Sequence, residues 1–180
     1  MKKELYQIIE IPEGISAEII ENVLKISGAE GEIEKKFNTN NLEFNKKGNE
    51  IIIGNKKATK KEKKLMNTIT AHIKNMIEGV QKKFEYQLKI CFSHFPINVE
   101  IKEGEAIIKN FLGEKIPRRA KIPKGVEIEM DKEIIKVISP NKELAGQAAA
   151  NFETATKIRK KDRRVFQDGI FIINKAGKEI

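Results

Sequence analysis

The densest positive charge in the sequence lies in residues 157–164, which hold six basic side chains and one acid, Asp162. This local excess of +5 is more than half of the formal net charge of +9. The apolar segment 169–173 follows, and residues 166–169 between them contain Asp-Gly, a strong turn dipeptide. We therefore expect a basic loop held between a helix and a strand. A basic loop with a fixed shape could bind a polyanion such as folded RNA or DNA. A solvated loop that only aids solubility would account for this stretch of charge equally well.

A second basic set comes earlier in the chain. Five positive charges occur within ten residues and no acid lies among them: Lys115, Arg118, Arg119, Lys121 and Lys124. Prolines at positions 117 and 123 restrict the backbone of this segment. Arginine brings a planar fork of donors that matches phosphate oxygens. The two basic sets together predict one anion-binding surface.

Catalytic candidates are few. Cys91 and His94 are close in sequence, but on one strand their side chains would point to opposite faces, so His94 could not activate the thiol. The sequence has no glycine-rich phosphate loop and no convergent pair of acids. One cysteine and two histidines also make a structural zinc site implausible. We therefore expect no enzymatic activity, no cofactor, no small-molecule substrate and no metal.

The composition bounds the class of protein. With 180 residues, 39% hydrophobic and 34% charged, the chain can form two domains with real cores. We expect a first domain at residues 1–82, a second at 83–175 and a short tail at 176–180. The N-terminus lacks the apolar core of a signal peptide, and no apolar run reaches the ~18 residues of a membrane span. The sequence therefore predicts a cytoplasmic protein with no membrane partner.

The first half has period-two segments followed by one helical segment. We expect strands at 5–11 and 33–37 and a hairpin of 42–44 with 51–53. A helix then begins at Thr59, where Glu62 completes a capping box. Its apolar stripe is Leu65, Ile69, Ile73 and Ile77, with Gly79 as the stop and His72 packed at the edge. The surrounding lysines, at positions 56, 57, 60, 61, 63 and 64, are expected to form a solvated face or a weak secondary contact.

The second half repeats this plan. Strands are expected at 84–92, 96–101, 106–111, 115–122, 126–130 and 133–138. Ser139 is expected to cap a second helix with Pro140 at its first position, and Leu144, Ala148, Phe152 and Ala155 form its apolar stripe. Similar segments recur 83 and 85 residues apart, as in 48–52 with 131–135. The fold class predicted is α+β: two tandem copies of a small, mostly antiparallel sheet with one helix packed on it and a closing strand.

Four segments resemble a known family. They are 93–99 (Ser-His-Phe-Pro-Ile-Asn-Val), 110–115 (Asn-Phe-Leu-Gly-Glu-Lys), Arg118-Arg119, and 164–170 (Arg-Val-Phe-Gln-Asp-Gly-Ile). Together they resemble the ribosomal protein L6 family of the large subunit, in its archaeal and eukaryotic form, over nearly the whole chain. The proline- and glycine-rich terminal signature of the bacterial branch is missing, which favours an archaeal protein.

The resemblance implies a structural protein bound to large-subunit rRNA near the base of the lateral stalk and the sarcin–ricin loop. There it would support the docking site of translation factors, beside neighbouring ribosomal proteins and without chemistry of its own. It also implies that the second domain makes most RNA contacts. The expected contact residues are Lys115, Arg118, Arg119, Lys121, Lys157, Arg159, Lys160, Lys161, Arg163, Arg164, Gln167, Asp168 and Gly169.

Two further expectations concern these residues. Asp168 is an acid at a phosphate-rich surface, so its role should be conformational, within a turn formed by residues 167–169.

The charge alone also permits a free-standing DNA-binding or chromatin-type protein. No helix-turn-helix with a basic recognition helix is visible, and the second helix is alanine-rich, which disfavours that alternative.

Overall fold

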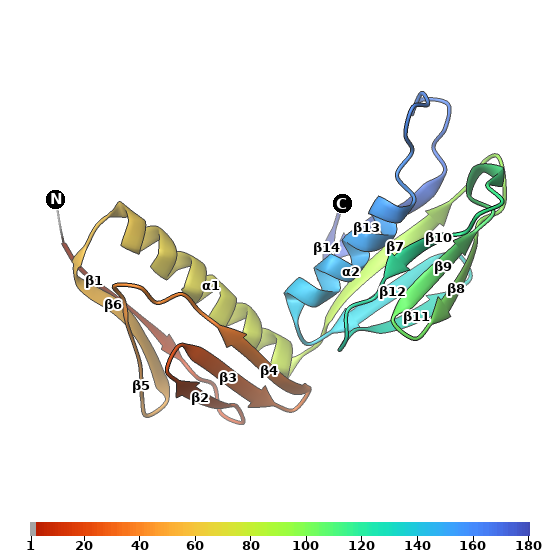
Figure 1. Ribbon diagram of the computed structural model, residues 1–180. Coiled ribbons are helices and arrows are strands. Elements are labelled where there is room, and N and C mark those ends of the chain that lie inside the picture. The colour runs from red at the N-terminus through yellow and green to blue at the C-terminus, as the bar shows by residue number, and fades with distance from the viewer. Residues whose placement is uncertain (1–2) are drawn as a thin grey trace. The chain divides into compact units, whose positions relative to one another are not determined.

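The computed structural model describes residues 3–180. The chain forms two compact units, one ending at Lys83 and the other beginning at Phe84 (Figure 1). Each unit has its own hydrophobic core.

The first unit contains two three-stranded antiparallel sheets and one helix. Strands β1 (Lys3–Glu10), β6 (Glu50–Ala58) and β5 (Glu43–Lys47) form one sheet, in the order β1-β6-β5. The other is a meander of β2 (Ser16–Ile20), β3 (Val23–Gly28) and β4 (Gly31–Lys36). Helix α1 (Lys60–Gln81) contacts strands of both sheets. Its buried face includes Met66, Ile69 and Ile73, so the helical stripe closes the core between the sheets.

The start of α1 confirms the predicted capping box. The Thr59 side chain accepts a hydrogen bond from the backbone of the first turn, and the Glu62 carboxylate accepts the Thr59 N–H at 2.8 Å. The predicted stop at Gly79 is wrong, because the helix continues to Gln81 and Gly79 is buried within it. The last turn is held by the β3–β4 hairpin: Glu30 N–H donates to the Val80 carbonyl at 3.0 Å. A Cβ at Gly28 would lie 2.9 Å from that same oxygen, so glycine permits this close approach.

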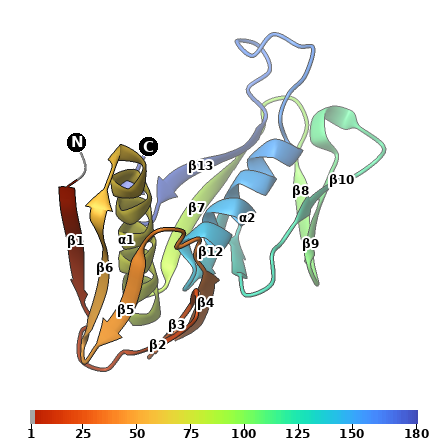
Figure 2. The ribbon, with the colours of Figure 1, turned by 60° about the vertical axis from the view of Figure 1, so that its left-hand side comes forward.

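The second unit contains a five-stranded and a three-stranded antiparallel sheet. The larger has the order β11-β12-β7-β13-β14, and the smaller is a meander of β8, β9 and β10. The strands are β7 (Phe84–Cys91), β8 (Asn98–Lys102), β9 (Glu105–Lys109), β10 (Arg118–Lys121), β11 (Glu127–Asp131), β12 (Ile134–Ser139), β13 (Gly169–Lys175) and β14 (Lys178–Glu179). Helix α2 (Lys142–Ala155) lies on strands β7, β10, β12 and β13, as Figure 2 shows. Its buried alanines, such as Ala145 and Ala148, allow close packing.

The topology confirms the duplication. In each unit a first strand (β1 or β7) is followed by a three-stranded meander, then by a hairpin whose second strand pairs antiparallel with the first, then by a helix. Each unit contains two sheets, where the sequence predicted one. The closing strand occurs only in the second unit, where β13 pairs with the outer edge of β7. The strand that follows α1 is β7, which belongs to the second unit.

Two predictions for the second unit, a strand and a helix cap, are wrong in detail. The strand expected at 115–122 is shortened to β10, because a 3-10 turn at Phe111–Gly113 comes first and Pro117 lacks an N–H. The tail, for which no element was predicted, contains β14, which pairs with β13 across a turn at Ala176 and Gly177. The cap of α2 is Asn141, whose Oδ1 accepts the N–H groups of Glu143 (2.9 Å) and Leu144 (3.4 Å). Ser139 is instead buried at the end of β12 and donates to the Gly125 carbonyl at 2.9 Å.

We therefore expect Asn141→Ala to lower the free energy of unfolding by about 1 kcal/mol, because two N–H groups of the first turn of α2 lose their acceptor. Asn141→Asp keeps the acceptor oxygen and should retain most of that stability. Urea-induced unfolding followed by circular dichroism measures both. Equal stability of the alanine variant and the native protein would show that Asn141 is not the effective cap.

Candidate nucleic-acid interface

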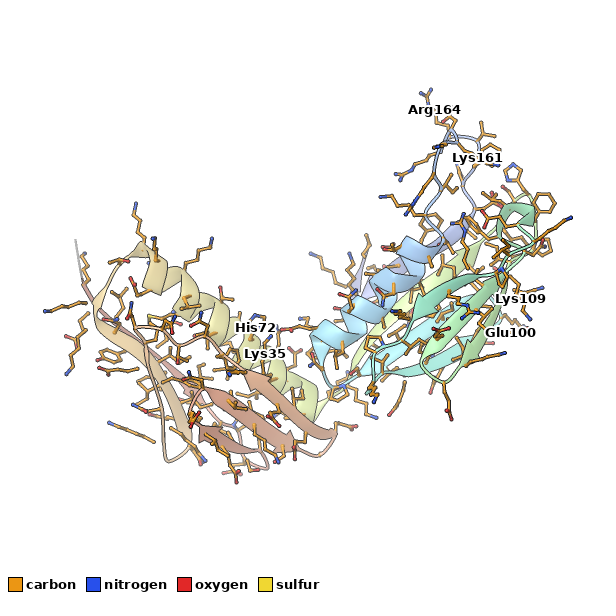
Figure 3. All side chains as sticks on the ribbon, viewed as in Figure 1. Lys35, His72, Glu100, Lys109, Lys161 and Arg164 are labelled. Atoms are coloured by element: carbon orange, nitrogen blue, oxygen red, sulfur yellow. The ribbon has the colours of Figure 1, made fainter. Side chains whose placement is uncertain are left out.

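The predicted basic loop is present. Residues 157–168 join the end of α2 to the start of β13 and protrude from that end of the second unit (Figures 1 and 3). We call this segment the basic loop. Its six basic side chains are all exposed: Lys157, Arg159, Lys160, Lys161, Arg163 and Arg164. Figure 3 shows Lys161 and Arg164 projecting from it.

Both ends of the basic loop are tied to the core. At one end, Thr156 is buried, and its hydroxyl accepts the N–H of Ile170 at 3.0 Å and donates to the Phe152 carbonyl at 3.1 Å. At the other end, the Asp168 side chain is only 1% exposed. Its Oδ1 accepts the backbone N–H groups of Ser93 (2.8 Å) and His94 (3.1 Å). The loop therefore leaves and rejoins the unit at fixed points.

Asp168 is held in its ionised form. Burial alone would raise the pKa of this carboxyl, but the backbone N–H groups of His94 and Ser93 and the His94 side chain together lower it from 3.8 to about 2. The His94 Nδ1 lies 2.6 Å from Oδ2, and because the carboxylate can only accept, the ring nitrogen donates. Asp168 thus acts on the conformation of the loop, the kind of role that its sequence context suggested.

An aromatic stack supports the same end of the loop. The ring of Phe166 lies on the ring of His94, with centroids 4.8 Å apart and planes inclined by 21°. The Lys161 ammonium lies 4.4 Å from the Phe166 centroid, a cation–π contact. Residues from the loop tip, the loop end and the segment after β7 therefore pack as one group.

The tip of the loop is a turn built on its single acid. The Asp162 carbonyl accepts the N–H groups of Val165 (3.2 Å) and Phe166 (3.0 Å), and its carboxylate accepts the N–H of Arg164 at 2.9 Å. The Arg164 side chain is 93% exposed, and its ion pair with Asp162, at 3.8 Å, is too solvated to hold it. Asp162 therefore shapes the turn and leaves the arginines available to a partner.

Arg118 differs from the other predicted contact residues, because its guanidinium is half-buried and held by several groups of the protein, whereas the exposed Arg119 meets, among the described residues, only the Glu105 carboxylate, at 3.5 Å. Arg118 makes a fork with the Glu114 carboxylate (2.8 and 2.6 Å) and donates from Nη1 to the carbonyls of Ala155 (2.9 Å) and Lys157 (3.3 Å). It also lies 4.2 Å from the centroid of the Phe111 ring. The Arg118 hydrogen bonds lower the pKa of the Glu114 carboxyl. Arg118 thus completes the end of α2 and anchors the first residue of the loop.

The remaining predicted residues are divided between two places. Arg119 and Lys121 are exposed on β10, while Ala120 between them is buried, so they lie on the opposite face of the strand from Ala120 and Arg118. Lys115 is exposed before β10, and Gln167 is exposed beside Asp168. Gly169 is buried at the start of β13, where a Cβ would lie 2.9 Å from the Phe171 ring. In the first unit, the lysines at 56, 57, 60, 61, 63 and 64 are all exposed around the start of α1.

Sequence reasoning missed the partners of the loop. Cys91 ends β7 and His94 lies in the segment beyond it, so the two do not share a strand, and the His94 ring is bonded to Asp168. His94 and Asp168 are 74 residues apart, and only the pairing of β13 with β7 brings them together. The motif at 93–99 could have indicated that His94 has a functional role, but it could not identify Asp168 as its partner.

Within residues 3–180, no cluster of three or more histidine, cysteine or acidic side chains could hold a metal ion. In the same range, no helix is long and apolar enough to cross a membrane.

Comparison with known proteins identifies the family. The family model described as Ribosomal protein L6 matches residues 11–83 and 95–169, one match in each unit. The chain belongs to the ribosomal protein L6 family. Large ribosomal subunit protein uL6 from Nanoarchaeum equitans is 43% identical, over 96% of this chain and 94% of its own length. The proteins of the same name from Sulfurisphaera tokodaii and Methanobrevibacter smithii are 44% and 41% identical, over 95% and 93% of this chain and 92% and 94% of their own lengths.

Membership of the L6 family confirms the resemblance drawn from the four motifs, together with its archaeal form. It also confirms the prediction of a structural protein that is not an enzyme. The two matches of the family model agree with the α+β duplication seen in the topology.

The geometry of Asp168 predicts an acid-dependent stability. Because its pKa is lower in the folded protein (about 2) than its ordinary value of 3.8, the folded state binds fewer protons than the unfolded state between these pH values. This stabilisation, about 2 kcal/mol, is complete above pH 4 and is lost as the pH falls toward 2. Asp168→Asn should therefore be less stable than the native protein at pH 7, and the difference should shrink below pH 4.

Urea-induced unfolding at a series of pH values measures this difference. Asp162→Asn is the matched control, since its carboxylate is exposed and an asparagine oxygen can accept the same Arg164 N–H. A stability difference for Asp168→Asn that is the same at pH 7 and pH 3 would contradict the assignment.

The contacts of Arg118 predict a structural cost that its neighbour does not share. Arg118→Ala leaves the Ala155 and Lys157 carbonyls without their donor, so we expect a loss of about 1–3 kcal/mol in the free energy of unfolding. Arg119→Ala, at an exposed position on the same strand, should change it by less than about 0.5 kcal/mol. Urea-induced unfolding of both variants tests this, and equal effects would disprove the anchoring role of Arg118.

Proposed function

We propose that this protein is a structural component of the large ribosomal subunit that binds rRNA mainly through the basic loop of its second unit. The proposed location is near the base of the lateral stalk and the sarcin–ricin loop, where the protein supports the docking site of translation factors. The proposed partners are large-subunit rRNA and neighbouring ribosomal proteins. The names of its relatives, all large-subunit proteins, support this assignment.

The observation that carries the proposal is a highly charged loop on a fixed base. Six exposed basic side chains project from a backbone that is tied down at Thr156 and Asp168. A loop ordered before binding loses less conformational entropy when it meets a rigid partner. Neutralising about six phosphates would make the affinity fall by roughly 10³-fold between 50 and 200 mM salt. Structured rRNA presents such a fixed array of phosphates.

The predicted contact residues have different roles in this proposal. The side chains of Lys157, Arg159, Lys160, Lys161, Arg163 and Arg164 meet phosphates, and Lys115, Arg119 and Lys121 form a flanking contact. Arg118, Asp168 and Gly169 position the loop and its neighbours, and Gln167 lies in the turn beside them. A recognition helix of a DNA-binding protein is disfavoured, because α2, which leads into the loop, is packed on four strands.

Charge reversal at the loop tip tests the proposal. We expect Arg163→Glu with Arg164→Glu to abolish incorporation into large subunits and to reduce the slope of log affinity against log salt by about 2, since two phosphate contacts are lost. The measurements are sucrose-gradient sedimentation of cell lysate with immunoblotting, and binding of purified protein to large-subunit rRNA at several salt concentrations.

The matched control carries the same change of charge elsewhere in the unit. Lys175 and Lys178 are exposed and pair with each other at the β13–β14 turn, at the other end of β13 from the basic loop. Lys175→Glu with Lys178→Glu should incorporate normally, and circular dichroism should show that both double variants are folded. Normal incorporation of the Arg163 and Arg164 double variant would overturn the proposed RNA face.

A further inference from the structure

A cavity of about 840 Å³ opens beneath the basic loop. It lies between the two ends of the loop, the end of β7 and the start of β13, and its volume is within the range of about 300–1,000 Å³ typical of ligand pockets. The side chains that matter for its chemistry are Cys91, Phe92, Lys157, Arg163, Val165 and Phe171.

Large apolar side chains that are partly exposed line part of this cavity. Phe92, Val165 and Phe171 are 42%, 60% and 44% exposed, and all three line it. Large apolar side chains that gather in one hollow, surrounded by polar groups, mark a binding site. Phe171 occupies its position because Gly169 has no side chain: a Cβ there would lie 2.9 Å from the Phe171 ring. The absence of a side chain at Gly169 therefore leaves room for the Phe171 ring, which is one of the aromatic groups that line the cavity.

The charge around the cavity selects an anionic occupant. Lys157 and Arg163 line it, and both belong to the loop whose excess charge is +5. Two carboxylates, Glu153 and Asp168, also line it and keep their negative charge, although each accepts a backbone N–H group: Glu153 from Ile172 at 3.1 Å, and Asp168 from Ser93 at 2.8 Å. The six cations of the basic loop outnumber these two acids and Asp162, so the surroundings of the cavity carry an excess of positive charge.

We propose that this cavity binds one unpaired nucleotide of the RNA held by the basic loop. A base has a flat face that can stack on Phe171 or Phe92, and its phosphate can pair with Arg163 and Lys157. Folded RNA offers such nucleotides in its bulges and loops, where bases turned out of the helix are recognised by stacking on aromatic side chains. The cavity would thus add recognition of one base to a surface that otherwise contacts phosphates. This inference rests on the proposed function, because it requires RNA on the loop.

Cys91 provides a direct reporter of occupancy. It is the chain's only cysteine and it lines the cavity. We expect saturating archaeal large-subunit rRNA, stripped of protein, to slow the alkylation of Cys91 by iodoacetamide at least tenfold. Chemical probing of the same rRNA should show one unpaired nucleotide that becomes protected at its base when the protein binds.

The variant that tests the stacking is Phe171→Ala, with Met130→Ala as its control. Met130 is 47% exposed on β11, separated from β13 by β12 and β7 in the same sheet. Phe171→Ala should bind the rRNA roughly tenfold more weakly with the same salt dependence, since it removes a stacking contact and no charge. At saturating rRNA it should leave Cys91 reactive and the single base unprotected, while the phosphate footprint persists. Met130→Ala should behave as the native protein does.

The possible results separate the cavity from the loop. If the native protein binds rRNA but Phe171→Ala leaves affinity, base protection and Cys91 protection unchanged, the nucleotide site is wrong and the proposed function stands. If Cys91 is protected only in whole subunits and not by the deproteinised rRNA, the occupant is a neighbouring protein and the inference is overturned. If the native protein does not bind rRNA at all, this inference falls together with the proposed function.

Discussion

The second unit depends on one buried carboxylate. Asp168, 1% exposed, accepts hydrogen bonds from two backbone N–H groups of the segment after β7 and from the His94 ring. An ionised group at this depth is stable only with such partners, and each partner is held in place by the charge that it satisfies. The start of β13, the end of β7 and the returning end of the basic loop are thereby fixed to one another. The arrangement of the positive surface follows from that constraint.

The duplication explains why this surface belongs to the second unit. Both units share the strand, meander, hairpin and helix, but only the second continues past its helix into a loop and a further strand. In the first unit, within the described residues, β1 pairs with β6 alone, whereas in the second the added β13 covers the outer edge of β7. The segment that completes this sheet also carries the basic loop. Its addition therefore extends the sheet and supplies the exposed positive charge together.

Positive charges that are adjacent in sequence have different roles in the structure. Arg118 points to the end of α2 and is held by Glu114, the Ala155 carbonyl and the Phe111 ring. Its neighbour Arg119 is exposed on the opposite face of β10, and Arg164 extends from the loop tip. A count of basic residues therefore overstates the surface open to a partner. Arg118 is fixed within the protein, whereas the exposed arginines make only solvated ion pairs, Arg119 with Glu105 and Arg164 with Asp162.

Local patterns of charge, period and motif were enough to predict the family, the α+β class, the duplication, the capping box at Thr59 and the basic loop. Local patterns did not predict element boundaries that depend on neighbours in space. Asn141 caps α2 in place of Ser139, because Ser139 is buried at the end of β12 and its hydroxyl donates to the Gly125 carbonyl. Only the tertiary structure separated Arg118 from Arg119, because the packing of α2 decides which face of β10 is inside. The hydrogen bond between His94 and Asp168 and the cavity beside Cys91 could be found only in the folded structure. Both depend on the pairing of β13 with β7, which brings together segments that are 74 residues apart. Local patterns report what a residue prefers, whereas its partner depends on where the rest of the chain has folded.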